Sequence, residues 1–221
     1  MAATPITSQL SSIDPEPTEP RSRARAARRQ ALLETAEEVF AERGFSGATM
    51  SEIASRAGYS AGNLYNVFEG KDALFTEVVT TRADQVLEDI ASALAGGDSL
   101  GQIIDRYIDA TLAGVEAHRA FFLMLTQTTP DFEWHQPQEQ ADGSTLRSRI
   151  DGLVEGVFES AMARGEIPTG DSLPYACLLH GTLNAHVARW VRNRGSREEL
   201  WGPVPELRRL IRKALGVPES S

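Results

Sequence analysis

The sequence predicts an all-α fold, and three observations carry the prediction. Apolar residues recur every three or four positions along most of the 221-residue chain, which is the spacing of one face of a helix. No segment shows a convincing alternation of apolar and polar residues with the period of two that a half-buried strand requires. Glycines and helix-capping residues stand where these helical patterns begin and end.

The N-terminal segment has a different composition. Residues 1–20 contain four prolines and few large apolar side chains, so we expect a disordered tail. Five arginines follow between Arg21 and Arg29. They are either an arm that contacts DNA phosphates or the solvated start of a helix. Because cations at a helix N-terminus oppose the helix dipole, the pattern favours an external anionic partner.

The first helix is expected from residue 26 to 43. Gly44 follows it, and glycine is the preferred residue just after the end of a helix. One apolar stripe runs along this helix: Leu32, Leu33, Ala36, Val39 and Phe40.

Residues 49–71 predict two short helices joined by a tight glycine turn. Thr49 and Glu52 have the spacing of a capping box at the start of the first of them. Gly58 ends that helix, and Ser60 is suited to cap the next one. The residues expected to face inward from the first of the two are Ile53, Ala54 and Ala57.

The second of these short helices has an unusual outer face. At roughly 100° per residue, Leu64 and Phe68 fall on one narrow apolar edge together with Ala61. The remaining face carries glycine, asparagine and tyrosine where a surface helix normally carries Lys and Glu. Glycine permits close approach, asparagine can pair with adenine, and tyrosine can donate to a phosphate, so this face suits a DNA major groove. The alternative is a short structural helix in an ordinary bundle, with its asparagines acting as caps.

The rest of the chain predicts a larger helical domain. One helix is expected over 71–95, ending at Gly96-Gly97, and another begins at Leu146 with Gly152 and Gly156 four residues apart. This spacing would let a second backbone approach closely. Further helices are expected over 99–116, 118–127, 172–193 and 204–215, and residues 128–143 are expected to form a loop.

Charge is unevenly distributed. The chain has a net charge of −9. Residues 21–75 hold eight basic and seven acidic side chains, whereas residues 76–221 hold fourteen basic and twenty-one acidic ones. The acidity therefore lies away from the predicted helix-turn-helix, and the net charge does not argue against DNA binding.

The single cysteine and the lack of long apolar runs indicate the compartment. With only Cys177, the chain forms no internal disulfide, which favours a reducing environment. No signal-peptide pattern and no apolar run long enough to cross a bilayer is present. We expect a cytoplasmic protein with no membrane partner.

Residues Arg28 to Leu74 resemble the N-terminal domain of the tetracycline-repressor (TetR) family of bacterial regulators. The resemblance implies a homodimer of all-helical subunits, each with a helix-turn-helix domain over 21–75 and an effector-binding and dimerisation domain over 76–221. The residues that carry it are Ala36-Glu37-Glu38-Val39-Phe40, Gly44-Phe45, Thr49, Ile53-Ala54, Ala57-Gly58, Ser60, Gly62, Leu64-Tyr65, Phe68, Lys71 and Leu74.

The resemblance also assigns contacts to double-stranded DNA. Four residues would contact phosphates: Thr49, Ser60, Tyr65 and Lys71. Four others would face bases: Ala61, Gly62, Asn63 and Asn66. Departures from the commoner family pattern at Tyr59 and at Asn66-Val67 leave the operator sequence unpredicted.

By the same resemblance, residues 172–215 are expected to pair with their symmetry mates in a homodimer, although these helices could instead only close the monomer core. A small-molecule effector is expected among the middle helices. Few cations fall in the apolar stripes, which favours a hydrophobic or mildly cationic effector, and the 128–143 loop could act as its lid. The candidate effector-binding residues, each also compatible with plain core, are Tyr107, Phe121, Met124, Trp134, His180 and Asn184.

The sequence contains no recognisable arrangement of catalytic residues. Cys177 and His180 are three apart on one predicted helix, but zinc needs three or four ligands and no supporting histidine lies nearby. Cys177 is expected to be buried and unreactive in its apolar segment. We therefore predict no enzyme, no metal and no cofactor.

The function predicted is that of a ligand-responsive transcriptional regulator, a repressor that an effector releases from a palindromic operator. Effector binding would shift the helix over 71–95, which carries the DNA-binding domain, and so change the separation of the two reading heads. One alternative is an activator or architectural protein of the same fold. The other is a helical small-molecule-binding protein or enzyme with a non-functional DNA-binding head.

Overall fold

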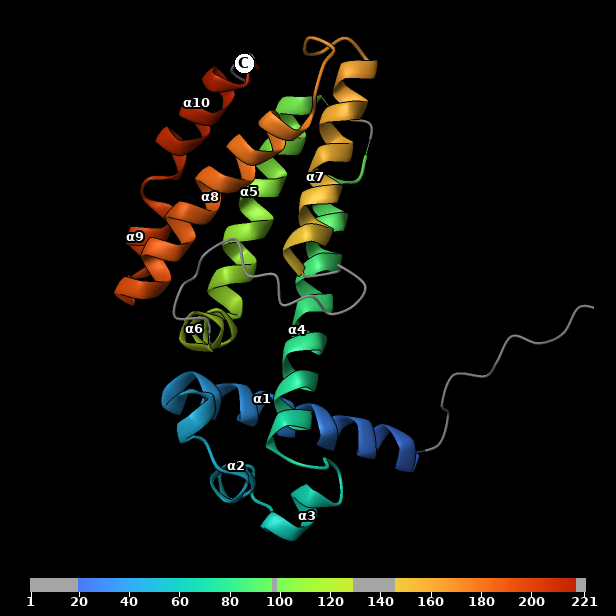
Figure 1. Ribbon diagram of the computed structural model, residues 1–221, viewed down its shortest axis with the longest axis vertical. Coiled ribbons are helices and arrows are strands. Elements are labelled where there is room, and N and C mark those ends of the chain that lie inside the picture. Colours follow the sequence, from blue (N-terminus) through green and yellow to red (C-terminus); the bar gives the residue numbers. More distant parts are fainter. Residues whose placement is uncertain (1–19, 97–98, 129–145, 218–221) are drawn as a thin grey trace, which may run out of the picture.

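The computed structural model describes residues 20–96, 99–128 and 146–217 (Figure 1). All regular secondary structure in these ranges is helical, which confirms the all-α prediction. The expected tail over 1–20, apart from residue 20, and the expected loop and lid over 128–143, apart from residue 128, lie outside the described residues. None of the helices that are described is both long enough and apolar enough to cross a membrane.

Three helices form the end of the molecule that we call the head: α1 (Pro20–Gly47), α2 (Met50–Arg56) and α3 (Ala61–Tyr65). The α1 helix begins six residues before the predicted start. It continues past the predicted end across a kink at Gly44, where φ is 70°. The arginines are thus part of a helix, and two of them find partners within the head or just beyond it. The Arg28 guanidinium lies 4.1 Å from the centre of the Tyr59 ring, and Arg29 Nε donates to Glu77 Oε1 at 2.6 Å.

The other seven helices form what we call the body. Those predicted are found within one residue of their expected bounds. The body helices are α4 (Lys71–Leu94), α5 (Leu100–Ala117), α6 (Arg119–Thr128), α7 (Leu146–Ala163), α8 (Leu173–Asn193), α9 (Arg197–Trp201) and α10 (Val204–Ala214).

The α9 helix was not predicted, because five residues are too few to display a helical period. A local signal for it is present in the sequence. Ser196 Oγ accepts a bond from the backbone N–H of Glu199, whose carboxylate accepts from the backbone N–H of Ser196. This reciprocal capping box defines the start of the helix.

The α4 helix connects the head to the body. Its first turns pack against α1, and its later turns lie beside α5 and α7 (Figure 1). The α8 helix covers α5 and α7 from another side, and α9 and α10 pack on α5 and α8. The short α6 helix packs along α1, so the head meets the body through two helices, α4 and α6.

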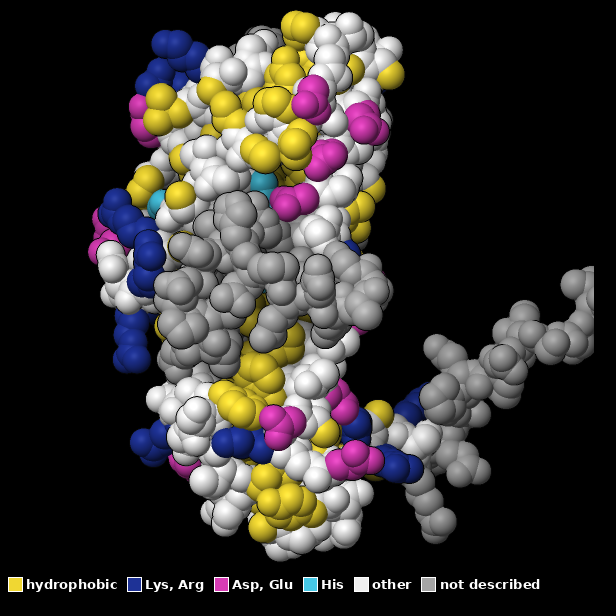
Figure 2. All heavy atoms as spheres, viewed as in Figure 1, with side chains coloured by type: hydrophobic (Ala, Val, Ile, Leu, Met, Phe, Trp, Pro, Cys, Tyr) yellow, Lys and Arg dark blue, Asp and Glu magenta, His cyan; other side chains and the backbone are white. Residues whose placement is uncertain are grey.

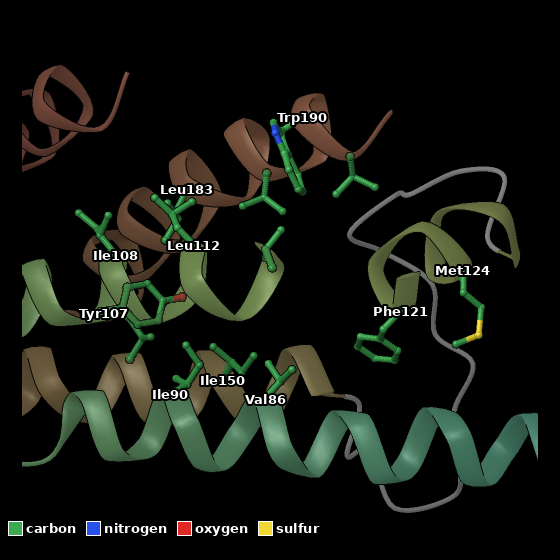
Figure 3. Packing of buried hydrophobic residues seen from close by; sticks show 14 of the residues in the cluster. Val86, Ile90, Tyr107, Ile108, Leu112, Phe121, Met124, Ile150, Leu183 and Trp190 are labelled. Carbon is green, nitrogen blue, oxygen red and sulfur yellow. The ribbon is translucent and has the colours of Figure 1, made fainter. Parts of the chain in front are cut away.

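Buried apolar side chains run from the head into the body. In the head, Phe40 meets Phe75 edge to face with ring centres 5.1 Å apart, and Leu64 is fully buried. In the body, Tyr107 projects from α5 toward Ile90 of α4 and Ile150 of α7 (Figure 3).

One expectation about a single side chain is wrong. Cys177 is exposed rather than buried, because α8 turns Ala176 and Leu179 inward and leaves Cys177 on its outer surface. Leu210 of α10 is 49% exposed. A Cβ atom built on Gly152 or Gly156 would meet no atom within 4 Å, so neither glycine makes a close contact within the described residues, and close approach by another backbone stays a prediction.

Candidate nucleic-acid interface and effector cavity

Capping residues define the geometry of the helix-turn-helix. Thr49 Oγ1 accepts from the backbone N–H of Glu52 at 3.1 Å, and Ser60 Oγ accepts from that of Asn63 at 3.3 Å. Each hydroxyl uses its oxygen at the cap, which leaves its proton to donate to an external acceptor such as a phosphate. The Glu52 carboxylate binds Arg56 Nη2 at 2.9 Å on the same helix.

The turn between α2 and α3 depends on one glycine. Gly58 has a φ of 76°, a region that side-chain-bearing residues rarely adopt. The chain then doubles back so that the Tyr59 N–H bonds to the Ala54 carbonyl at 2.8 Å. This turn places α3 across the end of α2, anchored by the fully buried Leu64 and the nearly buried Phe68.

The face of α3 opposite Leu64 is open. Hydrophobic side chains gather on the surface over α3, where Tyr65 is 55% exposed (Figure 2). A Cβ built on Gly62 would meet nothing within 4 Å, and Ala61 is half-buried beside it. The residues that α3 and its C-cap bring to this exposed face are Gly62, Asn63, Tyr65 and Asn66.

Lys71 has a role within the protein that its position in the sequence did not indicate. Its Nζ donates to the carbonyl oxygens of Phe45 at 2.8 Å and Ala48 at 3.1 Å, and it lies 4.6 Å from the centre of the Phe45 ring. The ammonium group therefore ties the start of α4 to the segment between α1 and α2. One of its three N–H donors remains for a phosphate, so the predicted DNA contact stays a prediction.

A cavity of about 60 Å³ lies between α4, α5, α7 and α8. Apolar side chains form most of its wall, including Val86 and Ile90 of α4 (Figure 3). Five residues with polar side chains also line it: Asp89, Tyr107, Thr111, His180 and Asn184.

Three of the six predicted effector residues line this cavity, namely Tyr107, His180 and Asn184. Phe121 and Met124 are fully buried on α6 and do not line it (Figure 3). Trp134 lies outside the described residues.

Thr111 was missed by the sequence analysis. It stands four residues after Tyr107 on α5, and residues at that spacing share a helix face. Thr111 therefore lies on the same side of α5 as Tyr107, in the cavity wall.

The polar groups in the cavity wall are unevenly satisfied. The Nδ1 atom of the buried His180 lies 2.9 Å from Asp151 Oδ1. Thr111 Oγ1 and Asn184 Nδ2 are buried, and neither has a hydrogen-bond partner within the part of the chain that the structure describes. Buried polar atoms in native proteins are seldom left unpaired, so these two atoms are suited to bind a ligand or water.

Charged groups join the head to the body. Arg82 of α4 and Glu37 of α1 form a buried ion pair with the closest atoms 2.8 Å apart. His118 stands at the junction of α5 and α6. Burial lowers its pKa, the positive charge of Arg82 lowers it further, and Glu37 and Asp89 oppose the change.

The described residues hold no group of three or more His, Cys, Asp or Glu side chains placed to bind a metal ion. Cys177 is exposed whereas His180 is 5% exposed, so the two do not share one environment on α8.

Comparisons with known proteins agree with this architecture. Residues 32–78 match the family model described as "Bacterial regulatory proteins, tetR family". The chain is 31% identical over 178 residues to the HTH-type transcriptional repressor BepR of Brucella suis biovar 1 (strain 1330), covering 77% of this chain and 84% of that one. It is 26% identical over 167 residues to the fatty acid metabolism regulator protein of Bacillus subtilis (strain 168), covering 73% and 82%.

A solved structure has the same fold. The transcriptional regulator FadR from Bacillus subtilis, in complex with stearoyl-CoA, superposes with a TM-score of 0.62 at 19% identity, covering 82% of this chain and 96% of that one. At 19% identity this structural similarity supports a shared fold and no more. Together with the matched head and the extended identity to BepR, it leads to one assignment: the chain belongs to the TetR family of bacterial regulatory proteins and is a ligand-responsive, DNA-binding transcriptional regulator.

Proposed function

We propose that this protein is a homodimeric repressor that binds a palindromic operator through α3 and leaves it when an effector enters the cavity of the body. The observation that carries this proposal is the continuity of α4. Leu74, in its first turn, is part of the core of the head, and Val86 and Ile90 of the same helix form a wall of the cavity.

The exposed face of α3 is the proposed reading surface. Asn63 and Asn66 present amides that can bond to two adenine atoms at once, and Gly62 allows the helix to approach the base edges. The backbone contacts are assigned to Thr49, Ser60 and Tyr65, whose hydroxyls can donate to phosphate oxygens. Lys71 and the half-buried Ala61 complete the set of residues that we place at the DNA.

The outer faces of α8 and α10 are the proposed dimer interface, within residues 172–215. Leu173 and Leu210 are each 49% exposed there, although most large apolar side chains of the body are buried. Buried contacts fix α10 in place: Arg212 Nη2 bonds to Asp105 Oδ2 at 2.5 Å and to the Gly101 carbonyl at 2.9 Å. A twofold axis at this surface would set two heads on half-sites about one DNA turn, or roughly 34 Å, apart.

The size of the cavity supports a coupling between effector and head. An engineered cavity of about 150 Å³ holds a molecule as small as benzene. The cavity here is about 60 Å³. A larger effector requires the surrounding helices to separate, and a displacement of α4 at Val86 and Ile90 would tilt the head. Effector and operator would then each favour a different separation of the two heads.

The repressor assignment has its support in BepR, whose name states that it is a repressor. An effector with a long apolar part is supported by the apolar cavity wall and by the stearoyl-CoA held by the FadR neighbour. Residues 21–75 remain our proposed DNA-binding domain and 76–221 the effector-binding and dimerisation domain. The α4 helix crosses the boundary between them.

Selection of bound sequences from random duplex DNA with the purified protein tests this function. Enrichment of a palindrome with half-sites about one turn apart is the expected result. Enrichment of a single unrepeated half-site would contradict the homodimer. A folded protein that enriches no sequence would contradict operator recognition and favour a helical ligand-binding protein with a non-functional head.

A further inference from the structure

The cavity between α4, α5, α7 and α8 contains two unsatisfied polar atoms that indicate which chemical group it binds. Asn184 Nδ2 and Thr111 Oγ1 are buried without a hydrogen-bond partner among the described residues, and both belong to residues of the cavity wall. They come from different helices, α8 and α5. A buried polar atom without a partner costs stability, so these two positions are better explained by a bound group than by packing.

The chemistry of these atoms restricts the ligand. An amide nitrogen has only hydrogens to offer, so Asn184 Nδ2 requires an acceptor. An ammonium group has no lone pair and cannot supply one. The hydroxyl of Thr111 can likewise donate to an acceptor. A cationic head group is therefore a poor match for this part of the wall.

The charges around the cavity also disfavour an anion. No Lys or Arg is among the residues found to line it, and Asp89 stands in its wall. A second carboxylate, Asp151, lies 2.9 Å from the Nδ1 atom of the lining residue His180. A carboxylate or phosphate placed here would be desolvated beside like charges, which is costly in a buried site.

We infer that the cavity binds an uncharged carbonyl group carried on an apolar molecule, with Asn184 and Thr111 donating hydrogen bonds to its oxygen. Ketones, esters, thioesters and lactones share this chemistry. The apolar remainder contacts Val86, Ile90, Val115 and Ile150 of the wall. The inference rests on the proposed function in placing the effector in this cavity, and it adds the class of group that is recognised.

The test compares four eight-carbon probes that differ only in their polar group: octan-2-one, octane, octanoate and octylammonium. Calorimetric binding to the full-length protein is measured for each, and binding is repeated with Thr111→Val and Asn184→Leu. Thr111→Val replaces the hydroxyl by a methyl group of nearly the same size, so this variant alone can test the site if Asn184→Leu does not fold. Thr80→Val, the same change at an exposed position on α4, is the control.

We expect octan-2-one to bind at least tenfold more tightly than the two charged probes. Each cavity variant should weaken octan-2-one by about tenfold, as the loss of one buried hydrogen bond implies, and leave octane unaffected. Tighter binding of octanoate or octylammonium, absence of octan-2-one binding at its solubility limit, or equal loss in Thr80→Val would overturn the inference.

A separate measurement distinguishes this inference from the proposed function. Release of the selected operator duplex is followed by fluorescence anisotropy during addition of octan-2-one. Binding that depends on Thr111 and Asn184 without operator release would support the carbonyl site and contradict the proposed effector role of the cavity. Operator release by octan-2-one that is as strong in the Thr111 and Asn184 variants as in the wild type would support the regulator and contradict the carbonyl site.

Discussion

Arg82 of α4 and Glu37 of α1 form an ion pair across the junction of head and body, with 2.8 Å between their closest atoms. Their side chains are only 14% and 8% exposed. Arg82 also donates to Gln85 on its own helix, so the guanidinium is held from two sides. Because α4 connects the head to the cavity, this pair helps to fix the angle at which the body presents the head.

Breaking this pair from one side should be strongly destabilising. Arg82→Met leaves the Glu37 carboxylate buried without its partner, which typically costs about 3–5 kcal/mol. Replacing both residues, as in Glu37→Gln with Arg82→Met, should restore part of that loss. Urea denaturation of the two single variants and the double variant gives the coupling free energy directly.

A matched control for this change is an exposed ion pair that also involves α4. Arg149 of α7 pairs with Asp84 of α4, but these side chains are 43% and 59% exposed. Arg149→Met should therefore change the free energy of unfolding by less than about 1 kcal/mol. Equal effects of Arg82→Met and Arg149→Met would show that burial does not distinguish the two pairs.

Lys71→Ala should have two separate effects. Loss of the bonds to the Phe45 and Ala48 carbonyls should lower the free energy of unfolding by about 2 kcal/mol. If the ammonium also meets a phosphate, DNA affinity should fall equally for all sequences, and the slope of log affinity against log salt should decrease by about 1. Lys213→Ala, on the exposed side of α10, is the control and should do neither.

The asparagines of the α3 face should act differently from Lys71. Asn63→Ala and Asn66→Ala should each weaken operator binding by about 1–3 kcal/mol, the value of a good base contact, without changing the salt slope. Competition titrations with operator and scrambled duplexes separate the two quantities. Asn193→Ala, at the exposed end of α8, should change neither, and an equal loss on scrambled DNA would remove the asparagines from the reading surface.

The head could be predicted closely from the sequence because its signals are local. The caps at Thr49 and Ser60 and the glycines at 44 and 58 each depend on a few neighbouring residues, and the structure places them as expected. The start of α1 was not predicted, because arginines near a helix N-terminus oppose its dipole. Two of these arginines, Arg28 and Arg29, have partners that lie far along the chain, Tyr59 and Glu77, which local patterns do not reveal.

The cavity could be predicted only in part, for the same physical reason. Helical spacing placed Tyr107 and His180 on inward faces, but which inward residues surround a space depends on how four helices pack. The partners of Lys71 lie 23 and 26 residues away, so its internal role was invisible to local patterns. The exposure of Cys177 depends likewise on which side of α8 meets α5 and α7.

The lowered pKa of His118 predicts a dependence of stability on pH. Burial is the main cause, and the charge of Arg82 adds to it, so the folded protein binds this proton less readily than the unfolded chain, whose histidine titrates near 6.5. Stability is therefore lost as pH falls below about 6.5. His118→Gln should flatten this dependence between about pH 6.5 and 5 in urea denaturation experiments.

The carboxylate of Glu166 titrates in a lower range and provides an internal reference. The Leu100 backbone N–H and then Arg164 lower the pKa of Glu166 below its usual 4.5, so its contribution is lost only as pH falls further through that lowered value. Wild type and His118→Gln should lose stability alike below about pH 4.5. Identical curves from pH 7.5 to 5 would exclude His118 as the group that titrates there.

The exposed leucine of α10 gives the sharpest test of the dimer interface. Leu210 is 49% exposed, while Arg212, two residues further along, is 5% exposed and fixes the helix against α5. If α10 pairs with its symmetry mate, Leu210→Asp places a charge on each side of the twofold axis and should raise the dimer dissociation constant by at least about 100-fold. Analytical ultracentrifugation measures this constant. Ala163→Asp, a charge added on the exposed side of α7, should leave the dimer dissociation constant unchanged.

Because half-site reading requires two heads, Leu210→Asp should also weaken binding to a full operator far more than binding to a single half-site. An unchanged dimer would place the interface elsewhere on the body.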